Sequence, residues 1–255
     1  MPVHNRLSVA HRGFSYIAPE NTLLAYKMAV QFKANGAECD VHTTSDGVIV
    51  LSHDGNMKRT LGKDALITNT PFSEFRKADA GLWMGKQFKG EVPPTLEEFL
   101  ELLNGTTCYP VIEIKMKGIE QPVIDLVKKH GLLDVSTIIT FDAEVAAKVR
   151  KMEPDISVAW LYSEDMKGKT AEAEADRLTE FFLQKCAELD TNILDLNYGL
   201  LSEKLIKNLH DHGVVVWAWT VDNPKGMEQL LDWGIDSITT NRTDLLAEVL
   251  KKRKM

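Results

Sequence analysis

Short apolar runs alternate along the chain with longer segments in which apolar residues recur every three or four positions. The short runs predict buried strands, and the three-to-four spacing predicts amphipathic helices. In residues 21–33, for example, Leu24, Met28 and Phe32 fall on one helical face. The pattern predicts strands over residues 7–10, 37–42, 109–114, 137–140, 157–161, 193–196, 214–219 and 237–240, and helices over residues 21–33, 95–103, 121–130, 143–152, 171–188, 202–212, 225–233 and 244–252.

Each predicted strand precedes one predicted helix, which favours an α/β fold of the TIM (β/α)8 barrel type over a doubly wound sheet. We expect a single domain over residues 1–255. The alternation is interrupted between Gly55 and about Pro94 by a polar and aromatic segment that is too long for an ordinary βα connection. We interpret residues 55–94 as a small inserted subdomain after the hairpin of the second strand, with its aromatic residues forming a core of their own.

Composition narrows the class of protein only slightly. The chain of 255 residues has a formal net charge of −7 and lacks the basic excess typical of nucleic-acid binding. Its three cysteines are widely spaced, which indicates buried free thiols rather than a disulfide framework or a zinc site. The first residues do not resemble a signal peptide, and no apolar run reaches the roughly 20 residues of a transmembrane helix. We therefore expect a cytoplasmic protein with no membrane anchor; the sequence leaves its oligomeric state open.

Ionisable residues lie at the predicted carboxyl ends of the first three barrel strands, where the active sites of such barrels are found. These residues form three pairs, one at each strand end. A single pair of this kind is typical of a loop or a solvated surface, but three pairs at three strand ends indicate a functional site. They are His11 and Arg12 after the first strand, Glu38 and Asp40 on one face of the second, and Glu113 and Lys115 on one face of the third.

The segment after the second strand returns a histidine towards these carboxylates. Asp46-Gly47 predicts a two-residue hairpin turn, which would set Ser45 opposite Val48 and, counting back, Asp40 opposite His53. Opposite residues share a face of the sheet, so this register would bring His53 beside the carboxylates. A three-residue loop would put it on the wrong side.

The residue types at this site indicate phosphoryl chemistry. Glu38, Asp40 and Glu113 would be costly to bury as bare charges, and an all-oxygen set favours one divalent cation, Mg²⁺ or Ca²⁺, over zinc. Arg12 and Lys115 beside such a cation are suited to holding a phosphoryl group.

Proton transfer can be assigned to the two histidines, His11 and His53, because unperturbed imidazoles titrate near neutrality. Metal, cations and histidines together indicate phosphodiester cleavage. Trp219 lies near the carboxyl end of its strand and is a candidate to cover the substrate, whereas Trp217 is expected in the core. His42 shares the face of the carboxylates, but it should lie about 6 to 7 Å beyond Asp40 and is not expected to bind the metal.

The ordered motifs of the chain resemble those of the glycerophosphodiester phosphodiesterase family over about residues 7–246. The resemblance rests on His11-Arg12-Gly13, Pro19-Glu20-Asn21-Thr22, Glu38-x-Asp40, Asp46-Gly47 leading to His53-Asp54, Pro94-Thr95-Leu96-Glu97-Glu98, Glu113-Ile114-Lys115 and Trp219-Thr220-Val221.

This resemblance implies a TIM barrel with an insertion, and hydrolysis of glycerophosphodiesters to sn-glycerol 3-phosphate and an alcohol, a reaction of lipid and glycerol metabolism. It implies a divalent metal on Glu38, Asp40 and Glu113, acid-base roles for His11 and His53, and phosphate binding by Arg12 and Lys115. Three positions depart from the family pattern: Cys39 replaces an aliphatic residue, Asp222 replaces an asparagine and Asn241 replaces an aspartate. The last two could tune the substrate pocket.

Some roles and two rival functions stay open. Asp54 could orient His53 or only begin the insertion, and Glu20 could hold Arg12 or only start a helix. A lysophospholipase D-like enzyme on the same barrel is one rival, because the insertion is partly apolar. A catalytically silent barrel that binds phosphorylated ligands is the other.

Overall fold

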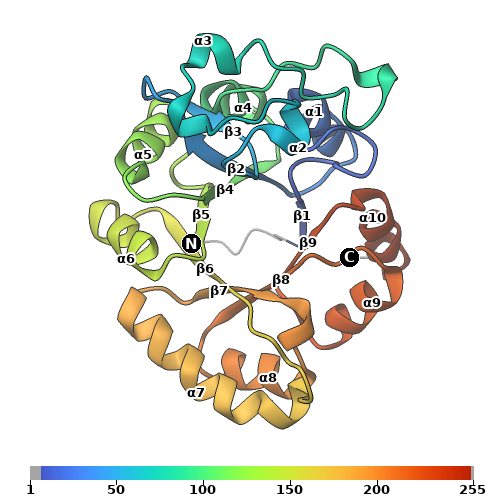
Figure 1. Cartoon of the computed structure of the whole chain (residues 1–255). Coiled ribbons are helices and arrows are strands. Elements are labelled where there is room, and N and C mark those ends of the chain that lie inside the picture. Colours follow the sequence, from blue (N-terminus) through green and yellow to red (C-terminus); the bar gives the residue numbers. More distant parts are fainter. Residues whose placement is uncertain (1–6, 254–255) are drawn as a thin grey trace.

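A closed parallel barrel forms the centre of the computed structural model of the chain, which describes residues 7–253 (Figure 1). Its strand order is β1-β9-β8-β7-β6-β5-β4-β2, and pairing of β1 with β2 closes the ring. The TIM barrel prediction is confirmed. The barrel strands are β1 (Ser8–Ala10), β2 (Gly36–Thr43), β4 (Tyr109–Ile114), β5 (Thr137–Thr140), β6 (Ser157–Tyr162), β7 (Ile193–Asn197), β8 (Val215–Trp219) and β9 (Ser237–Thr240).

Helices surround the barrel, as Figure 1 shows, and each lies between successive strands or after the last. Apolar side chains fill two layers, one inside the barrel around Trp217 and Leu161 and a larger one between the strands and the helices. The helices of this outer ring are α1 (Leu23–Gln31), α4 (Leu96–Leu103), α5 (Glu120–Lys129), α6 (Ala143–Met152), α7 (Ala171–Leu189), α8 (Glu203–Asp211), α9 (Pro224–Asp232) and α10 (Thr243–Lys252), with the short 3-10 helix η3 (Tyr198–Leu200) before α8.

The largest difference between the predicted and observed bounds concerns the first helix. Thr22 is its N-cap, because the Thr22 hydroxyl accepts a hydrogen bond from the Ala25 amide. Asn21, immediately before it, has a left-handed backbone with φ of 55°. The two residues therefore lie outside the helix, and the side chain of Asn21 is free to turn towards the barrel.

The predicted hairpin register is wrong. Strand β3 (Ile49–Leu51) pairs Leu51 with Val41 rather than with His42, because a three-residue loop, Ser45 to Gly47, separates Thr44 from Val48. The Thr44 hydroxyl fixes this loop by donating to Asp46 Oδ1 and accepting from the Val48 amide.

This register does not move His53 away from the barrel mouth. The ladder ends at Ser52, whose amide donates to the Asp40 carbonyl, so strand alternation does not apply to the next residue. The chain turns there, and His53 lines the same pocket as Glu38.

Residues 55–94 contain α2 (Lys58–Leu61), η1 (Ile67–Asn69), α3 (Phe72–Phe75) and η2 (Lys86–Phe88), at the top of Figure 1. Their core is made by Met57, Leu61, Ile67 and Phe75 against Val50 of the hairpin. The expected aromatic core is thus confirmed only for Phe75, with Phe72 packed at its edge, while Trp83 is 42% exposed.

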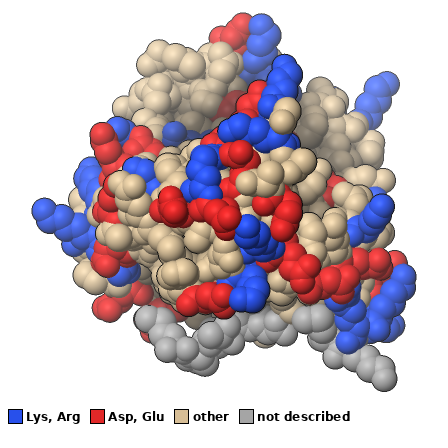
Figure 2. Space-filling model, turned by 90° about the horizontal axis from the view of Figure 1, so that it is seen from below, with Lys and Arg blue, Asp and Glu red and all other residues tan. Residues whose placement is uncertain are grey.

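Charges of both signs are mixed over the face formed by α7 and α8 (Figure 2). Ion pairs such as Lys204 with Asp176 and Lys207 with Asp211 account for part of this mixture. No helix within residues 7–253 combines the length and the apolar character needed to cross a membrane. Residues 1–6, on which part of the signal-peptide expectation falls, lie outside the described part of the chain.

Candidate active site

Three carboxylates meet on two neighbouring strands of the barrel. Glu38 and Asp40 lie on β2 and Glu113 lies on β4, where the register sets it beside Asp40. One oxygen from each lies within 4.8 Å of the others, and all three residues are buried. The structure therefore brings together the three predicted metal ligands.

The pKa values of these three carboxyl groups are shifted in opposite directions. Burial, with the charges of Asp40 and Glu113 added, raises the pKa of Glu38 well above its usual value. Burial and the charge of Asp40 likewise raise the pKa of Glu113 to about 7. Burial also opposes ionisation of Asp40, but Arg12 and Lys115 outweigh it and hold the pKa of Asp40 below its usual range.

The donor set fits a hard divalent cation. Among residues 7–253, Glu38 Oε1 and Asp40 Oδ1 are buried without a hydrogen-bond partner, although a buried carboxylate oxygen normally has one. Lys115 Nζ lies 3.4 Å from Asp40 Oδ1. Carboxylate oxygens are ligands that Mg²⁺ and Ca²⁺ prefer, and a cation bound here would satisfy both atoms.

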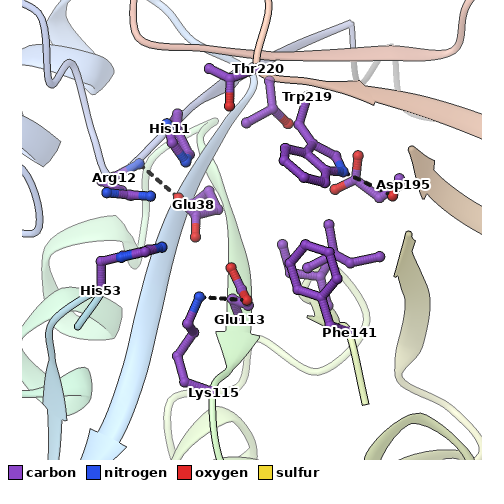
Figure 3. Close-up of a pocket in the computed structure, with 13 residues that line it drawn as sticks. His11, Arg12, Glu38, His53, Glu113, Lys115, Phe141, Asp195, Trp219 and Thr220 are labelled. Atoms are coloured by element: carbon purple, nitrogen blue, oxygen red, sulfur yellow. Dashed lines mark hydrogen bonds and ion pairs between the residues drawn. The ribbon is translucent and has the colours of Figure 1, made fainter. Parts of the chain in front are cut away.

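Two cationic side chains border the carboxylates (Figure 3). Arg12 Nε lies 3.3 Å from Asp40 Oδ2, and the Arg12 amide donates to Glu38 Oε2 at 2.7 Å. The Lys115 ammonium donates to Glu113 at 2.8 Å. Their placement beside the predicted metal ligands is the arrangement that the sequence pattern indicated.

His11 is held as a neutral imidazole by its surroundings. Its Nδ1 lies 2.7 Å from Asn241 Oδ1, so it donates to the amide, and Asn241 is itself held by Asp222 and Ser15. Burial, with the charge of Arg12 added, lowers the pKa of His11 to about 4. The two departures from the family pattern, Asp222 and Asn241, therefore act together on a predicted catalytic histidine.

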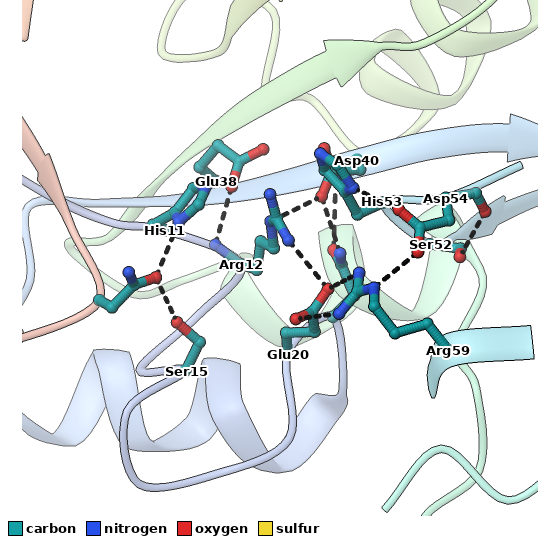
Figure 4. A network of polar contacts seen from close by, with 12 residues as sticks. His11, Arg12, Ser15, Glu20, Glu38, Asp40, Ser52, His53, Asp54 and Arg59 are labelled. Atoms are coloured by element: carbon teal, nitrogen blue, oxygen red, sulfur yellow. Dashed lines mark hydrogen bonds and ion pairs between the residues drawn. The ribbon is translucent and has the colours of Figure 1, made fainter. Parts of the chain in front are cut away.

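His53 approaches the carboxylates from the hairpin side of the pocket. Its Nδ1 lies 2.7 Å from Asp54 Oδ1, and Asp54 Oδ2 accepts from Arg59 at 2.6 Å (Figure 4). His42 Nε2 lies 3.3 Å from the His53 carbonyl and stays outside the carboxylate cluster.

A cavity of about 170 Å³ connects these groups with an apolar wall. Trp219 lines this wall with Phe141, the two rings meeting edge to face with centroids 5.4 Å apart, and Leu161 lies beside them. Trp217 is buried in the barrel core, as expected. The pocket thus has one charged side and, facing it, an aromatic side that also carries the Asp195 carboxyl, as Figure 3 shows.

Two residues near the site were not assigned a role from the sequence. Asn21 donates to Asp40 Oδ2 at 2.8 Å and accepts from the Asp40 amide, so it fixes that carboxylate. Asp195 lines the pocket with Oδ1 unpartnered within residues 7–253, and burial raises its pKa well above the usual value. Asp195 could have been noticed in the sequence, because it is a carboxylate within the otherwise apolar strand Ile193–Asn197. For Asn21 the sequence offered only its position in the motif Pro19-Glu20-Asn21-Thr22.

The sequence matches a known protein family and several of its named members. Residues 11–245 match the model of the Glycerophosphoryl diester phosphodiesterase family. The glycerophosphodiester phosphodiesterase of Caldanaerobacter subterraneus subsp. tengcongensis is 32% identical over 96% of this chain and 98% of that protein. A Bacillus subtilis protein of the same name is 28% identical over 96% of this chain and 86% of that protein.

Solved structures of similar fold include a phosphodiesterase of Oleispira antarctica in complex with its product sn-glycerol-3-phosphate. It superposes with a TM-score of 0.86 at 24% identity and covers 96% of each chain, which supports the fold. Because the family model spans nearly all of the described residues, and a relative above 30% identity covers almost the whole chain, this protein belongs to the glycerophosphoryl diester phosphodiesterase family.

Proposed function

We propose that the protein hydrolyses glycerophosphodiesters to sn-glycerol 3-phosphate and an alcohol, in a single catalytic domain with residues 55–94 as an inserted subdomain. One observation supports this most strongly: two histidines and two cations line one pocket together with Glu38 and Glu113, two members of the buried cluster of three carboxylates. Family membership and the names of the relatives support the same reaction.

Arg12 and Lys115 are proposed to hold the phosphate. Both already contact carboxylates, and both line the cavity, so their N–H groups can be shared with an incoming anion. Arginine and lysine beside the reacting phosphorus would stabilise the negative charge that grows on its oxygens as the leaving group departs.

His11 and His53 are proposed to transfer protons. Neutral His11, with its Nδ1–H donated to Asn241, keeps the Nε2 lone pair free to accept a proton from the attacking hydroxyl. His53, with its Nδ1–H donated to the Asp54 carboxylate, can deliver a proton from Nε2 to the alkoxide as the phosphorus–oxygen bond breaks. The attacking hydroxyl could belong to water or to the glycerol of the substrate.

Glu38, Asp40 and Glu113 are proposed to bind one Mg²⁺ or Ca²⁺ ion. Such an ion supplies Lewis-acid stabilisation of phosphoryl charge when bound. The unpartnered oxygens of Glu38 and Asp40 and the raised pKa of Glu113 support this assignment, because the three buried carboxylates share only the two nearby cations Arg12 and Lys115 among residues 7–253.

The dimensions of the pocket favour a small polar substrate over a lysophospholipid. Its volume of about 170 Å³ lies below the range of about 300–1,000 Å³ that is typical of drug-sized ligands. Trp219 and Phe141 would cover the carbon skeleton of the glycerol. The exposed apolar residues of the insertion, such as Leu82 and Trp83, are not among the residues that line this pocket.

The test is release of glycerol 3-phosphate from glycerophosphocholine, glycerophosphoethanolamine and glycerophosphoglycerol. Activity should disappear with chelator and return with Mg²⁺ or Ca²⁺. Lysophosphatidylcholine is the comparison substrate, and faster turnover of this lipid would refute the proposed substrate class. Binding of glycerol 3-phosphate without any hydrolysis would instead favour a silent phosphate-binding barrel.

A further inference from the structure

Arg59 joins two parts of the site that lie far apart in the sequence (Figure 4). It lies on α2, the first helix of the insertion, and its guanidinium faces the barrel mouth. Its Nη1 and Nη2 donate to the two carboxylate oxygens of Glu20, at 2.9 and 2.7 Å, while its Nε donates to Asp54 Oδ2 at 2.6 Å. One side chain thus holds a carboxylate from the β1–α1 connection and another from the end of the hairpin.

Each of these two carboxylates contacts a different residue of the proposed machinery. Glu20 Oε1 also accepts from Arg12 Nη1 at 3.0 Å. Asp54 Oδ1 also holds His53 Nδ1 at 2.7 Å. Arg59 therefore lies one carboxylate away from both the phosphate-holding cation and the proton-transferring histidine.

Two features of the surroundings hold Arg59 against Glu20. One is the packing of its helix, and the other is the charge of the Glu20 carboxylate. The neighbouring residues Met57 and Leu61 are buried in the insertion core and anchor the short helix. Burial disfavours ionisation of Glu20, whose side chain is 11% exposed, but hydrogen bonds from Arg59 and the charge of Arg12 keep its pKa below the usual value. Without Arg59, Arg12 would be the one remaining counter-charge of Glu20 among residues 7–253.

We propose that Arg59 is a positioning residue, through which the insertion sets the orientations of Arg12 and His53 for the phosphodiesterase reaction. This inference rests on the proposed function. It gives the insertion a role in catalysis although none of its residues is among those that line the pocket. Arg59 itself touches neither the cavity nor the carboxylate cluster, so its effect must pass through Glu20 and Asp54.

The main test compares Arg59→Ala with Arg76→Ala. Arg76 is a matched control, because it also lies in residues 55–94 and makes a two-point pair with a carboxylate, that of Glu98, at 2.5 and 2.6 Å. It is not among the residues that line the pocket. Substituting a residue that orients a metal ligand typically costs about 10- to 100-fold in activity, and Arg59 orients the two carboxylates that hold Arg12 and His53. We expect kcat/KM of Arg59→Ala to fall by about that factor, with Arg76→Ala within about twofold of wild type and both variants melting at similar temperatures.

Substitutions of the two carboxylates that Arg59 holds should affect different kinetic constants. Glu20→Gln should mainly raise KM and weaken binding of sn-glycerol 3-phosphate, measured by calorimetry. Asp54→Asn should mainly lower kcat. Arg59→Ala should do both, and its effect on kcat should be smaller in an Asp54→Asn background, because coupled residues are not additive. Ethylguanidine should restore part of the rate to Arg59→Ala and none to Arg76→Ala.

Each outcome decides one question. A wild-type enzyme that releases no glycerol 3-phosphate overturns the proposed function and the inference together. An active wild type with Arg59→Ala unchanged, or reduced no more than Arg76→Ala, overturns the inference alone. Should Arg59→Ala fail to fold, Arg59→Lys serves in its place: one ammonium cannot reach both carboxylates as the guanidinium does, so a folded Arg59→Lys with full activity also overturns the inference.

Discussion

Removing one charge from the carboxylate cluster should stabilise the metal-free protein while weakening its response to metal. The substitution is Glu113→Gln, which keeps the shape of the side chain and an oxygen that can accept from Lys115. The Glu113 carboxyl is buried, and burial with the charge of Asp40 raises its pKa from 4.5 to about 7. At 1.36 kcal/mol per pKa unit, ionising it in the folded state costs about 3 kcal/mol at pH 8.

This cost has a defined pH dependence. Because the folded-state pKa lies above the unfolded value, the stability that protonation provides is complete below about pH 4.5 and is lost as the pH rises through about 7. In chelator at pH 8 the variant should therefore melt higher than wild type, by roughly 5 to 10 °C. Most of this difference should disappear by pH 5.

The assay is thermal unfolding followed by circular dichroism, in chelator and then in excess Mg²⁺ or Ca²⁺. Metal at 100 times its dissociation constant should add about 2.7 kcal/mol to wild type and much less to the variant. Glu97→Gln, which changes a half-exposed carboxylate on α4 that pairs with Lys129, is the control and should melt close to wild type at both pH values. A Glu113→Gln variant that is less stable than wild type in chelator at pH 8, or that responds equally to metal, would refute the reasoning.

Three further outcomes are expected. His11→Ala and His53→Ala should each lower kcat by about 10²- to 10⁴-fold without altering the circular dichroism spectrum, and near-normal rates in both would contradict their assigned roles. Gly13→Ala should lower the melting temperature more than Gly47→Ala: both glycines have positive φ, but a Cβ at Gly13 would lie 2.7 Å from Ala25 whereas Gly47 faces open space, so equal losses would argue against this clash. The three cysteine thiols, all buried, should react with a thiol reagent only after denaturant is added, and rapid labelling of the native protein would show otherwise.

The repeated alternation of strands and helices could be predicted from the local sequence, because apolar residues recur with a different spacing in strands and in helices. The bounds of β4 and α6 follow directly from this pattern. The carboxylates, cations and His11 could be assigned to one site for a related reason: in a parallel barrel all strands end at the same face, so residues at strand ends converge whatever the helices do.

The register of the β2–β3 hairpin could not be predicted from the local sequence. Its sequence, with Asp46-Gly47, favours a two-residue turn, but the Thr44 hydroxyl and a hydrogen bond from the Ser45 amide to the Thr70 carbonyl of the insertion select a three-residue loop. His53 reaches the pocket because strand β3 ends before it. The alternation of side chains along a strand therefore does not predict the direction of the His53 side chain.

The sequence by itself therefore determined the barrel, the identities of its ionisable residues and the face on which they lie, since these depend on spacing along the chain. Only the tertiary structure decided which groups hold them in place. Asn241 lies 230 residues from His11, Asn21 lies 19 residues from Asp40, and Arg59 lies 39 residues from Glu20, so no local pattern relates these partners. Such contacts depend on how distant elements pack, because a side chain finds its partner only when the fold has brought the two together.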